Sequence, residues 1–188
     1  MNKKTWISIL SLSLATMFMG ALIVLTHQWT APIIESRLNA GQNDSLFAVL
    51  PDADDFLSNS FEWNGQEIFY SRATNGAGLV FFVTGQGFGG PLEMLVGVNF
   101  EGLVTGVLVT DHNETPGLGS PGTEATFLSQ FAGNILEGFT VVESVSNEQE
   151  IEILSGATVT AEGIVGTVNQ IAYLFALAEA GQATGGTQ

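Results

Sequence analysis

The longest uncharged stretch of the chain, residues 5–34, most limits what this sequence can fold into. Within it, residues 6–25 are predominantly apolar. A helix of that length spans the roughly 30 Å hydrocarbon core of a bilayer. We therefore predict one transmembrane helix, residues 6–26.

The flanking residues predict the orientation of this helix. Lys3 and Lys4 precede it, and the first basic residue after it is Arg37. Positively charged flanks remain on the cytoplasmic side, and tryptophans such as Trp6 and Trp29 favour the two interfaces. We expect a short cytoplasmic N-terminus (residues 1–5), a single pass through the cytoplasmic (inner) membrane, and a main domain on the extracytoplasmic (periplasmic) side.

A cleaved signal peptide is the alternative interpretation of this stretch. Its apolar region would be shorter and would end at a small-residue cleavage site. Here the apolar run continues past Gly20 and Ala21, which favours a retained anchor. Both interpretations place the bulk of the chain outside the cytoplasm.

Composition excludes several classes of function. The chain has no cysteine, which excludes disulfides, thiolate metal sites, cysteine-held iron–sulfur clusters and a cysteine nucleophile. Its two histidines, His27 and His112, are far apart in sequence, which disfavours a multi-histidine metal site. The net charge of −15 repels nucleic acid. Such acidity suits solubility in high salt or docking to a basic partner.

Hydrophobic patterning beyond the anchor predicts an α+β domain of mixed or antiparallel sheet with flanking helices. We expect a juxtamembrane helical segment (27–55), one domain (56–181) and a disordered polar tail (182–188). The glycine-rich segment 85–91 is predicted to be a loop. The expected strands are 67–73, 78–85, a hairpin of 94–99 with 103–110, and 138–145; the expected helices are 123–131 and one from residue 160 or 161 to Gly181.

Two short motifs carry side chains suited to binding. The first is HNETPGLGS, residues 112–120, directly after the second strand of the hairpin. Its Pro116–Gly117 pair fixes a turn, and Gly119 permits close backbone approach. An ordinary turn is the alternative, but it does not explain the imidazole, carboxylate and hydroxyl groups gathered at a strand end.

The second motif is SGATVT, residues 155–160, immediately before the last helix. Gly156 and Ala157 leave the backbone open to a bulky group. Thr158 offers an alcohol that can be esterified, and the free amides of a helix start favour a phosphate. The hydroxyls of Ser155 and Thr160 can bind phosphate oxygens or cap the helix. A simple helix-capping turn is the alternative.

Together the anchor, the block from residue 85 to residue 119 and the S-G-A-T element resemble the FMN-binding domain family. This family includes the C subunit of the sodium-pumping NADH:quinone reductase and the G subunit of the Rnf electron-transport complex. The resemblance covers nearly the whole chain, and the short length is closer to the Rnf G subunit.

The resemblance implies a cofactor and a site. In this family a flavin transferase joins FMN through a phosphoester to the threonine that closes S-G-A-T, which is Thr158 here. It also implies that the H-x-E-T-P-G-L-G loop borders the flavin. The residues that it places near the flavin ring are Glu114, Thr115, Gly117 and Leu118, and those around the phosphate and ribityl chain are Ser155, Gly156, Ala157 and Thr160.

The function that follows is electron relay between subunits, with no catalytic residue and no metal. The resemblance implies a Rnf-type complex that moves electrons between ferredoxin and NAD and couples this to ion transport. Its second flavin subunit, iron–sulfur subunits and membrane subunits would be the partners. An extracytoplasmic sensory or structural module that holds FMN without passing electrons is the alternative.

Overall fold

The computed structural model describes residues 16–17, 19–20, 43–136 and 138–184. The chain divides into two compact units, Met1–Asn43 and Asp44–Gln188. In the first unit the five described residues are helical, four of them in the predicted transmembrane helix, and the rest of that helix lies outside the described residues. Residues 27–42 of the predicted juxtamembrane segment also lie outside them, as do residues 185–188 of the predicted tail.

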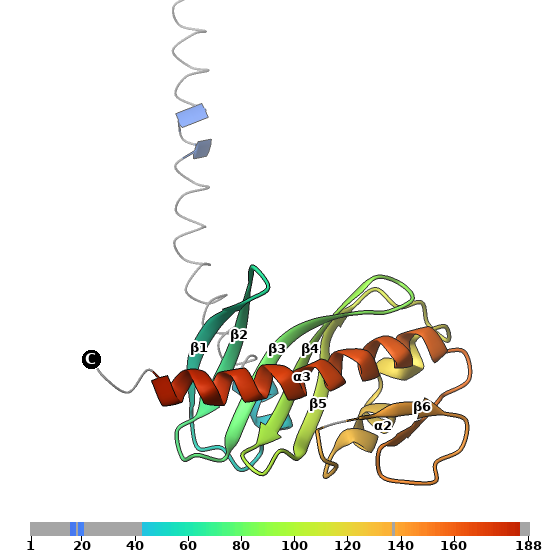
Figure 1. The fold of residues 1–188 in the computed structure, drawn as a ribbon. Coiled ribbons are helices and arrows are strands. Elements are labelled where there is room, and N and C mark those ends of the chain that lie inside the picture. Colours follow the sequence, from blue (N-terminus) through green and yellow to red (C-terminus); the bar gives the residue numbers. More distant parts are fainter. Residues whose placement is uncertain (1–15, 18, 21–42, 137, 185–188) are drawn as a thin grey trace, which may run out of the picture. The chain divides into compact units, whose positions relative to one another are not determined.

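A five-stranded antiparallel sheet forms the centre of the second unit (Figure 1). The strands follow one another in space as they do in sequence, each paired with the next. This confirms the prediction of an antiparallel sheet with flanking helices, and the predicted hairpin is β4 with β5. The strands are β1 (Phe56–Trp63), β2 (Gln66–Ala73), β3 (Gly78–Gln86), β4 (Pro91–Asn99) and β5 (Val104–His112).

The long helix α3 (Thr158–Thr184) covers one face of this sheet (Figure 1). Its buried residues Ile164, Val168 and Ile171 belong to the larger core together with Leu79 and Phe81 of β3. The helix begins two or three residues before the predicted start and continues beyond the predicted end at Gly181. Its first residue is therefore the threonine of the S-G-A-T element.

Much of the apolar character of α3 is explained by this packing. Among the described residues, only the stretch Thr158–Ala180 is long and apolar enough to cross a membrane by length and composition. Half of its most apolar window is buried inside the domain. Burial of apolar side chains against a sheet is a sufficient physical reason for that composition.

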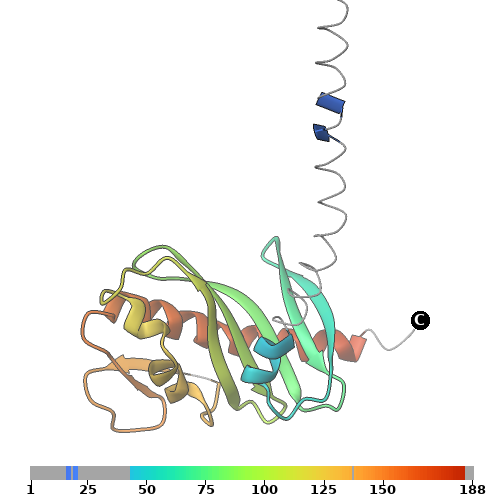
Figure 2. The ribbon, with the colours of Figure 1, turned by 180° about the vertical axis from the view of Figure 1, so that it is seen from behind.

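The opposite face of the sheet is covered by the segment that precedes β1 (Figure 2). Residues 44–49 are helical, and Leu46, Val49 and Leu50 form a second, smaller core with Val80 and Leu95. The compact unit therefore begins at Asp44, earlier than the expected domain boundary at residue 56. These residues pack on the sheet because their apolar side chains contact Val80 of β3 and Leu95 of β4, on the face of the sheet opposite α3.

Short elements complete the domain beyond β5. The region predicted as a single helix, 123–131, consists of three short turns that bury Phe127 and Phe131. The predicted strand 138–145 is reduced to β6 (Thr140–Val142), which pairs in parallel with β7 (Glu150–Glu152). The three turns are η1 (Ser120–Thr123), α2 (Ala125–Leu128) and η2 (Ser129–Phe131).

Candidate functional site

Three loops meet at the end of the sheet where α3 begins. The first, residues 87–90, joins β3 to β4, and the second, 113–119, follows β5. The third, 153–157, leads from β7 into α3. The sheet topology therefore brings the two motifs together, and adds the glycine-rich loop between β3 and β4.

The second loop contains the predicted turn. The Leu118 amide donates to the Thr115 carbonyl at 2.9 Å, and Gly117 has a φ of 80°. Proline followed by a residue with positive φ is the pattern of a type II turn, which requires glycine at that position. The Gly117 amide also donates to Ser120 Oγ at 2.9 Å, which fixes the turn against η1.

Gly119 joins the second loop to the third. Its amide donates to the Gly156 carbonyl at 3.1 Å, and its φ of 88° is in the left-handed region. A Cβ atom on Gly119 would collide with the Glu114 carboxylate and would lie 2.7 Å from Thr160 Oγ1. Only glycine therefore allows the two loops to approach this closely.

Glu114 belongs to the second loop and links it to the first through a buried side chain. Its side chain is only 7% exposed, and Oε1 accepts a hydrogen bond from the Gly89 amide at 3.2 Å. Oε2 is buried without a hydrogen-bond partner among the described residues. A buried carboxylate with a free oxygen is unusual, since the large majority of buried polar atoms are paired.

His112 fixes the start of the second loop. Its Nδ1 accepts from the Glu114 amide at 3.2 Å, and Nε2 lies 3.3 Å from Thr123 Oγ1. Because Nδ1 of the neutral imidazole accepts this hydrogen bond, the ring proton is on Nε2, which donates to Thr123 Oγ1. Thr123 in turn donates to the Ser120 carbonyl at 2.9 Å. His112 is thus part of the scaffold that holds Glu114.

Thr158 borders an open cavity of about 240 Å³ at the first turn of α3. Its side chain is exposed to solvent. Three of the other lining side chains are apolar and more than half exposed: Phe88, Leu118 and Val159. The full lining is Phe88, Leu118, Gly156, Thr158, Val159 and Thr160.

Thr160 differs from Thr158 although the two are only two residues apart. Its side chain is completely buried, and Oγ1 accepts from the Phe88 amide at 3.4 Å. Thr160 therefore supports the first loop, while the Thr158 hydroxyl is free to react with a group that enters the cavity. Ser155 is also exposed, but it is outside the cavity lining.

Four of the nine predicted site residues line the cavity: Leu118, Gly156, Thr158 and Thr160. Glu114 and Ala157 are buried, and Glu114 lies beneath the loops. Thr115, Gly117 and Ser155 are exposed around it. Sequence reasoning missed Phe88 and Val159. An aromatic residue between glycines in a loop was the available signal for Phe88.

These residues fit a ligand that joins a phosphate to a flat aromatic ring. The first amides of a helix have no intrahelical partners and favour a negatively charged group. The exposed Thr158 hydroxyl lies at this helix start, and exposed apolar side chains form the neighbouring walls. Among the described residues, no group of three or more histidine, cysteine, aspartate or glutamate side chains could hold a metal ion.

Comparison with known proteins identifies the class. Residues 87–172 match the family described as FMN-binding domain, a range that includes both motifs. Two crystal structures resemble the fold: NqrC of Shewanella oneidensis (TM-score 0.48, 20% identity, 66% of each chain) and the C subunit of the Na(+)-translocating NADH-quinone reductase of Parabacteroides distasonis (TM-score 0.48, 22% identity, 57% of this chain and 60% of that one).

Curated relatives narrow the class to one kind of subunit. The G subunit of the proton-translocating ferredoxin:NAD(+) oxidoreductase complex of Clostridium ljungdahlii is 29% identical over 85% of each chain. Its Na(+)-translocating counterpart in Acetobacterium woodii is 30% identical over 78% of this chain and 80% of that one. The G subunit of the ion-translocating oxidoreductase complex of Cereibacter sphaeroides is 30% identical over 90% and 83%. The chain therefore belongs to the family of G subunits of ion-translocating oxidoreductase complexes.

Proposed function

We propose that this chain is the electron-transfer subunit of an ion-translocating ferredoxin:NAD(+) oxidoreductase (Rnf-type) complex and carries FMN joined to Thr158 through a phosphoester. The relatives named above support the first part. The observation that supports the second is the exposed Thr158 hydroxyl at the first residue of α3, on the wall of an apolar cavity. Thr160, the nearest alternative threonine, is completely buried.

The residues around Thr158 have defined roles in this proposal. The free amides of the first turn of α3 stabilise the negative charge of the phosphodiester. Phe88, Leu118 and Val159 offer apolar surface to the ring. Glu114 and Thr160 hold the first loop, and with it Phe88, through the Gly89 and Phe88 amides. When bound, FMN supplies the redox chemistry, and the protein supplies position and electrostatics.

The surroundings of the chain follow from the same proposal. An N-terminal anchor holds the flavin domain on the extracytoplasmic side of the membrane, where a covalent bond prevents loss of the cofactor. A flavin transferase attaches the FMN during maturation. The second flavin subunit, the iron–sulfur subunits and the membrane subunits of the complex are the partners.

Intact-mass measurement tests the attachment. Wild-type chain, Thr158→Val and Ser155→Ala are each produced in full length together with the flavin transferase. We expect wild type and Ser155→Ala to gain the mass of FMN minus one water, because the ester forms with loss of water, and Thr158→Val to gain nothing. Unmodified wild-type chain, or a flavin retained by Thr158→Val, would contradict the proposal.

Reduction kinetics test the relay. In the assembled complex, the flavin of this subunit should be reduced and reoxidised during turnover with reduced ferredoxin and NAD(+). In a sensory module, the flavin would keep one redox state while turnover proceeds. A complex assembled with Thr158→Val should lose ferredoxin:NAD(+) activity although all subunits are present.

A further inference from the structure

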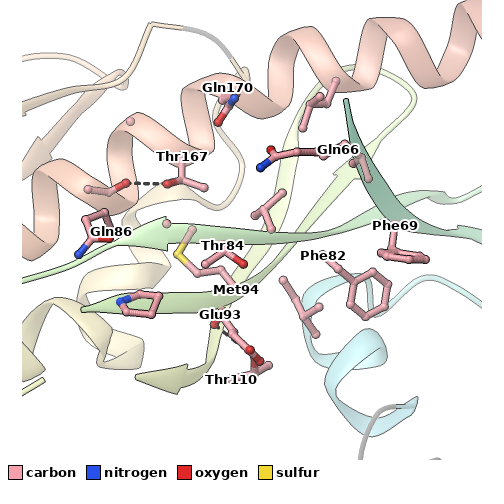
Figure 3. A pocket seen from close by; sticks show the side chains of 18 of the residues that line it. Gln66, Phe69, Phe82, Thr84, Gln86, Glu93, Met94, Thr110, Thr167 and Gln170 are labelled. Atoms are coloured by element: carbon pink, nitrogen blue, oxygen red, sulfur yellow. Dashed lines mark hydrogen bonds between the residues drawn. The ribbon is translucent and has the colours of Figure 1, made fainter. Parts of the chain in front are cut away.

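A cleft of about 940 Å³ opens between β2 and β3, separate from the cavity at Thr158 (Figure 3). Pairing between these strands is limited to four residues of each, and it stops at Phe69 and Phe82. Beyond that point β2 remains paired with β1 as far as Gln66, and β3 remains paired with β4 as far as Gln86. The two strands therefore separate while each stays part of the sheet.

This separation leaves two strand edges inside the sheet. Residues 66–68 of β2 and 83–86 of β3 border the cleft with no strand between them. Unpaired strand edges are templates for the addition of another strand, because their main-chain donors and acceptors repeat at the spacing of a β-ladder. An extended polypeptide segment matches that repeat better than a compact small molecule does.

The walls of the cleft suit such a segment. α3 closes one side with Gly163, Gly166, Thr167 and Gln170. A Cβ atom on Gly166 would meet nothing within 4 Å, so the space above this part of the helix is open. Thr167 donates to the Gly163 carbonyl at 2.8 Å and is already paired. Apolar residues with exposed surface, such as Ile68, Phe69 and Val83, offer contacts for alternate side chains of an added strand.

The charge of the cleft selects the chemistry of its occupant. Glu67, Glu93 and Glu162 line it and are exposed, and its lining contains no lysine or arginine. Among the described residues the only lysine or arginine is Arg72, which lies over the Phe100 ring at 5.1 Å. A carboxylate-lined cleft on a chain of net charge −15 repels nucleotides and other anions and attracts lysine and arginine.

We propose that this cleft binds an extended segment of another polypeptide that carries lysine or arginine side chains, and that the segment pairs with the β3 edge at residues 83–85, next to the point where α3 covers the Gln86 carbonyl. The inference rests on the proposed function in one respect, since the partner is taken to be another subunit of the complex. Loop 87–90, which carries Phe88, directly follows this edge. The β3 edge in the cleft and the loop at the candidate flavin site are therefore parts of one continuous stretch of chain.

Photocrosslinking identifies the occupant. The photoreactive residue p-benzoylphenylalanine is placed at Phe69, which is 53% exposed in the cleft, or at Val145, an exposed control outside it. The full-length chain is assembled in its complex and irradiated in native membranes, and cross-linked peptides are sequenced by mass spectrometry. We expect Phe69 to link to a lysine- or arginine-bearing segment of another subunit, at several times the yield at Val145.

Charge reversal tests the stated chemistry. Glu67→Lys with Glu93→Lys should lower the Phe69 cross-link at least threefold. Glu143→Lys with Glu148→Lys is the matched control, because both glutamates are exposed outside the cleft and the change in net charge is the same. We expect the control pair to leave the yield unchanged. An equal effect of the two pairs would overturn the electrostatic part of the proposal.

Hydrogen exchange tests the pairing with β3. Amides of residues 83–85 should exchange at least tenfold more slowly in the complex than in the isolated full-length chain in detergent. Equal exchange rates, a Phe69 yield no greater than that at Val145, or cross-links to a second copy of this chain, to its own residues 27–42 or to lipid would overturn the inference. Intact mass of the same sample reports flavin attachment, so failure of the proposed function is recognised separately.

Discussion

The helix α3 passes two openings of different construction. At its first turn, loops rich in glycine surround a small cavity with an exposed hydroxyl and apolar walls. Further along, the same helix borders a cleft nearly four times as large, where two strands part and carboxylates are exposed. The contact of Gly163 with the Gln86 carbonyl lies at the end of the cleft that is nearer to the cavity along the helix.

This difference separates two kinds of molecular task. The cavity has the elements that the proposed phosphate-bearing group requires: an exposed alcohol, helix amides and buried supports beneath the loops. The cleft has no nucleophile of that kind at a helix start, but it has strand edges and charge, which serve recognition of a polypeptide. Changes to the residues between and around these openings should affect them unequally.

The largest effect is expected where the helix crosses the strand. A Cβ atom on Gly163 would collide with the Gln86 carbonyl, which is backbone and cannot turn away. Gly163→Ala should therefore lower the free energy of unfolding by about 3 kcal/mol, at the upper end of the range for overpacking. Denaturant unfolding of the full-length chain, followed by tryptophan fluorescence, measures this.

Gly166→Ala is the matched control one turn further along the helix. The added methyl group meets open space in the cleft, and alanine is the better helix former, so stability should rise by about 0.5–1 kcal/mol. If both substitutions stabilised the protein, the inferred close contact between Gly163 and the Gln86 carbonyl would be wrong.

The next effect concerns the support beneath the cavity. Glu114→Ala removes the carboxylate that accepts from the Gly89 amide and should cost about 1–2 kcal/mol, because a hydrogen bond to a charged acceptor is lost. Glu114→Gln keeps an acceptor oxygen and removes a buried charge, and should cost less than half as much. Unfolding of the two variants distinguishes these cases, and an equal cost would mean that the hydrogen bond to Gly89 contributes little.

Patterning in the sequence predicted the elements that bury a continuous apolar face. The run at β3, the hairpin of β4 and β5 and the apolar spacing of α3 were found for this reason. β1 was missed because its central residues are polar and largely exposed, and it is held by pairing with β2. β7 has only three residues, too few to show a period. Such elements depend on partners distant in sequence.

The candidate site was predicted in part for a similar reason. Each motif was visible as a local pattern, but contacts such as that between the Phe88 amide and Thr160, 72 residues apart, depend on the completed sheet. The burial of Glu114 beneath the loops follows from the approach of Gly87, Gly89 and Gly119, which no local pattern reveals. β2 and β3 part without any change of register, and hydrophobic alternation does not reveal such a divergence of two strands.

The smallest effect on stability, and the sharpest test of the two openings, comes from two exposed phenylalanines. Phe88 is 64% exposed at the cavity and Phe69 is 53% exposed in the cleft, so alanine at either position should change the free energy of unfolding by less than about 0.5 kcal/mol.

Quenching of flavin fluorescence by iodide separates the two phenylalanines. On flavinylated chain, Phe88→Ala removes part of the wall beside Thr158 and should raise this quenching. Phe69→Ala should leave that quenching unchanged, because Phe69 borders only the cleft. Equal quenching in both variants would mean that the flavin does not lie against the Phe88 wall, and the assignment of the ring to the cavity would have to be abandoned even if Thr158 carries the ester.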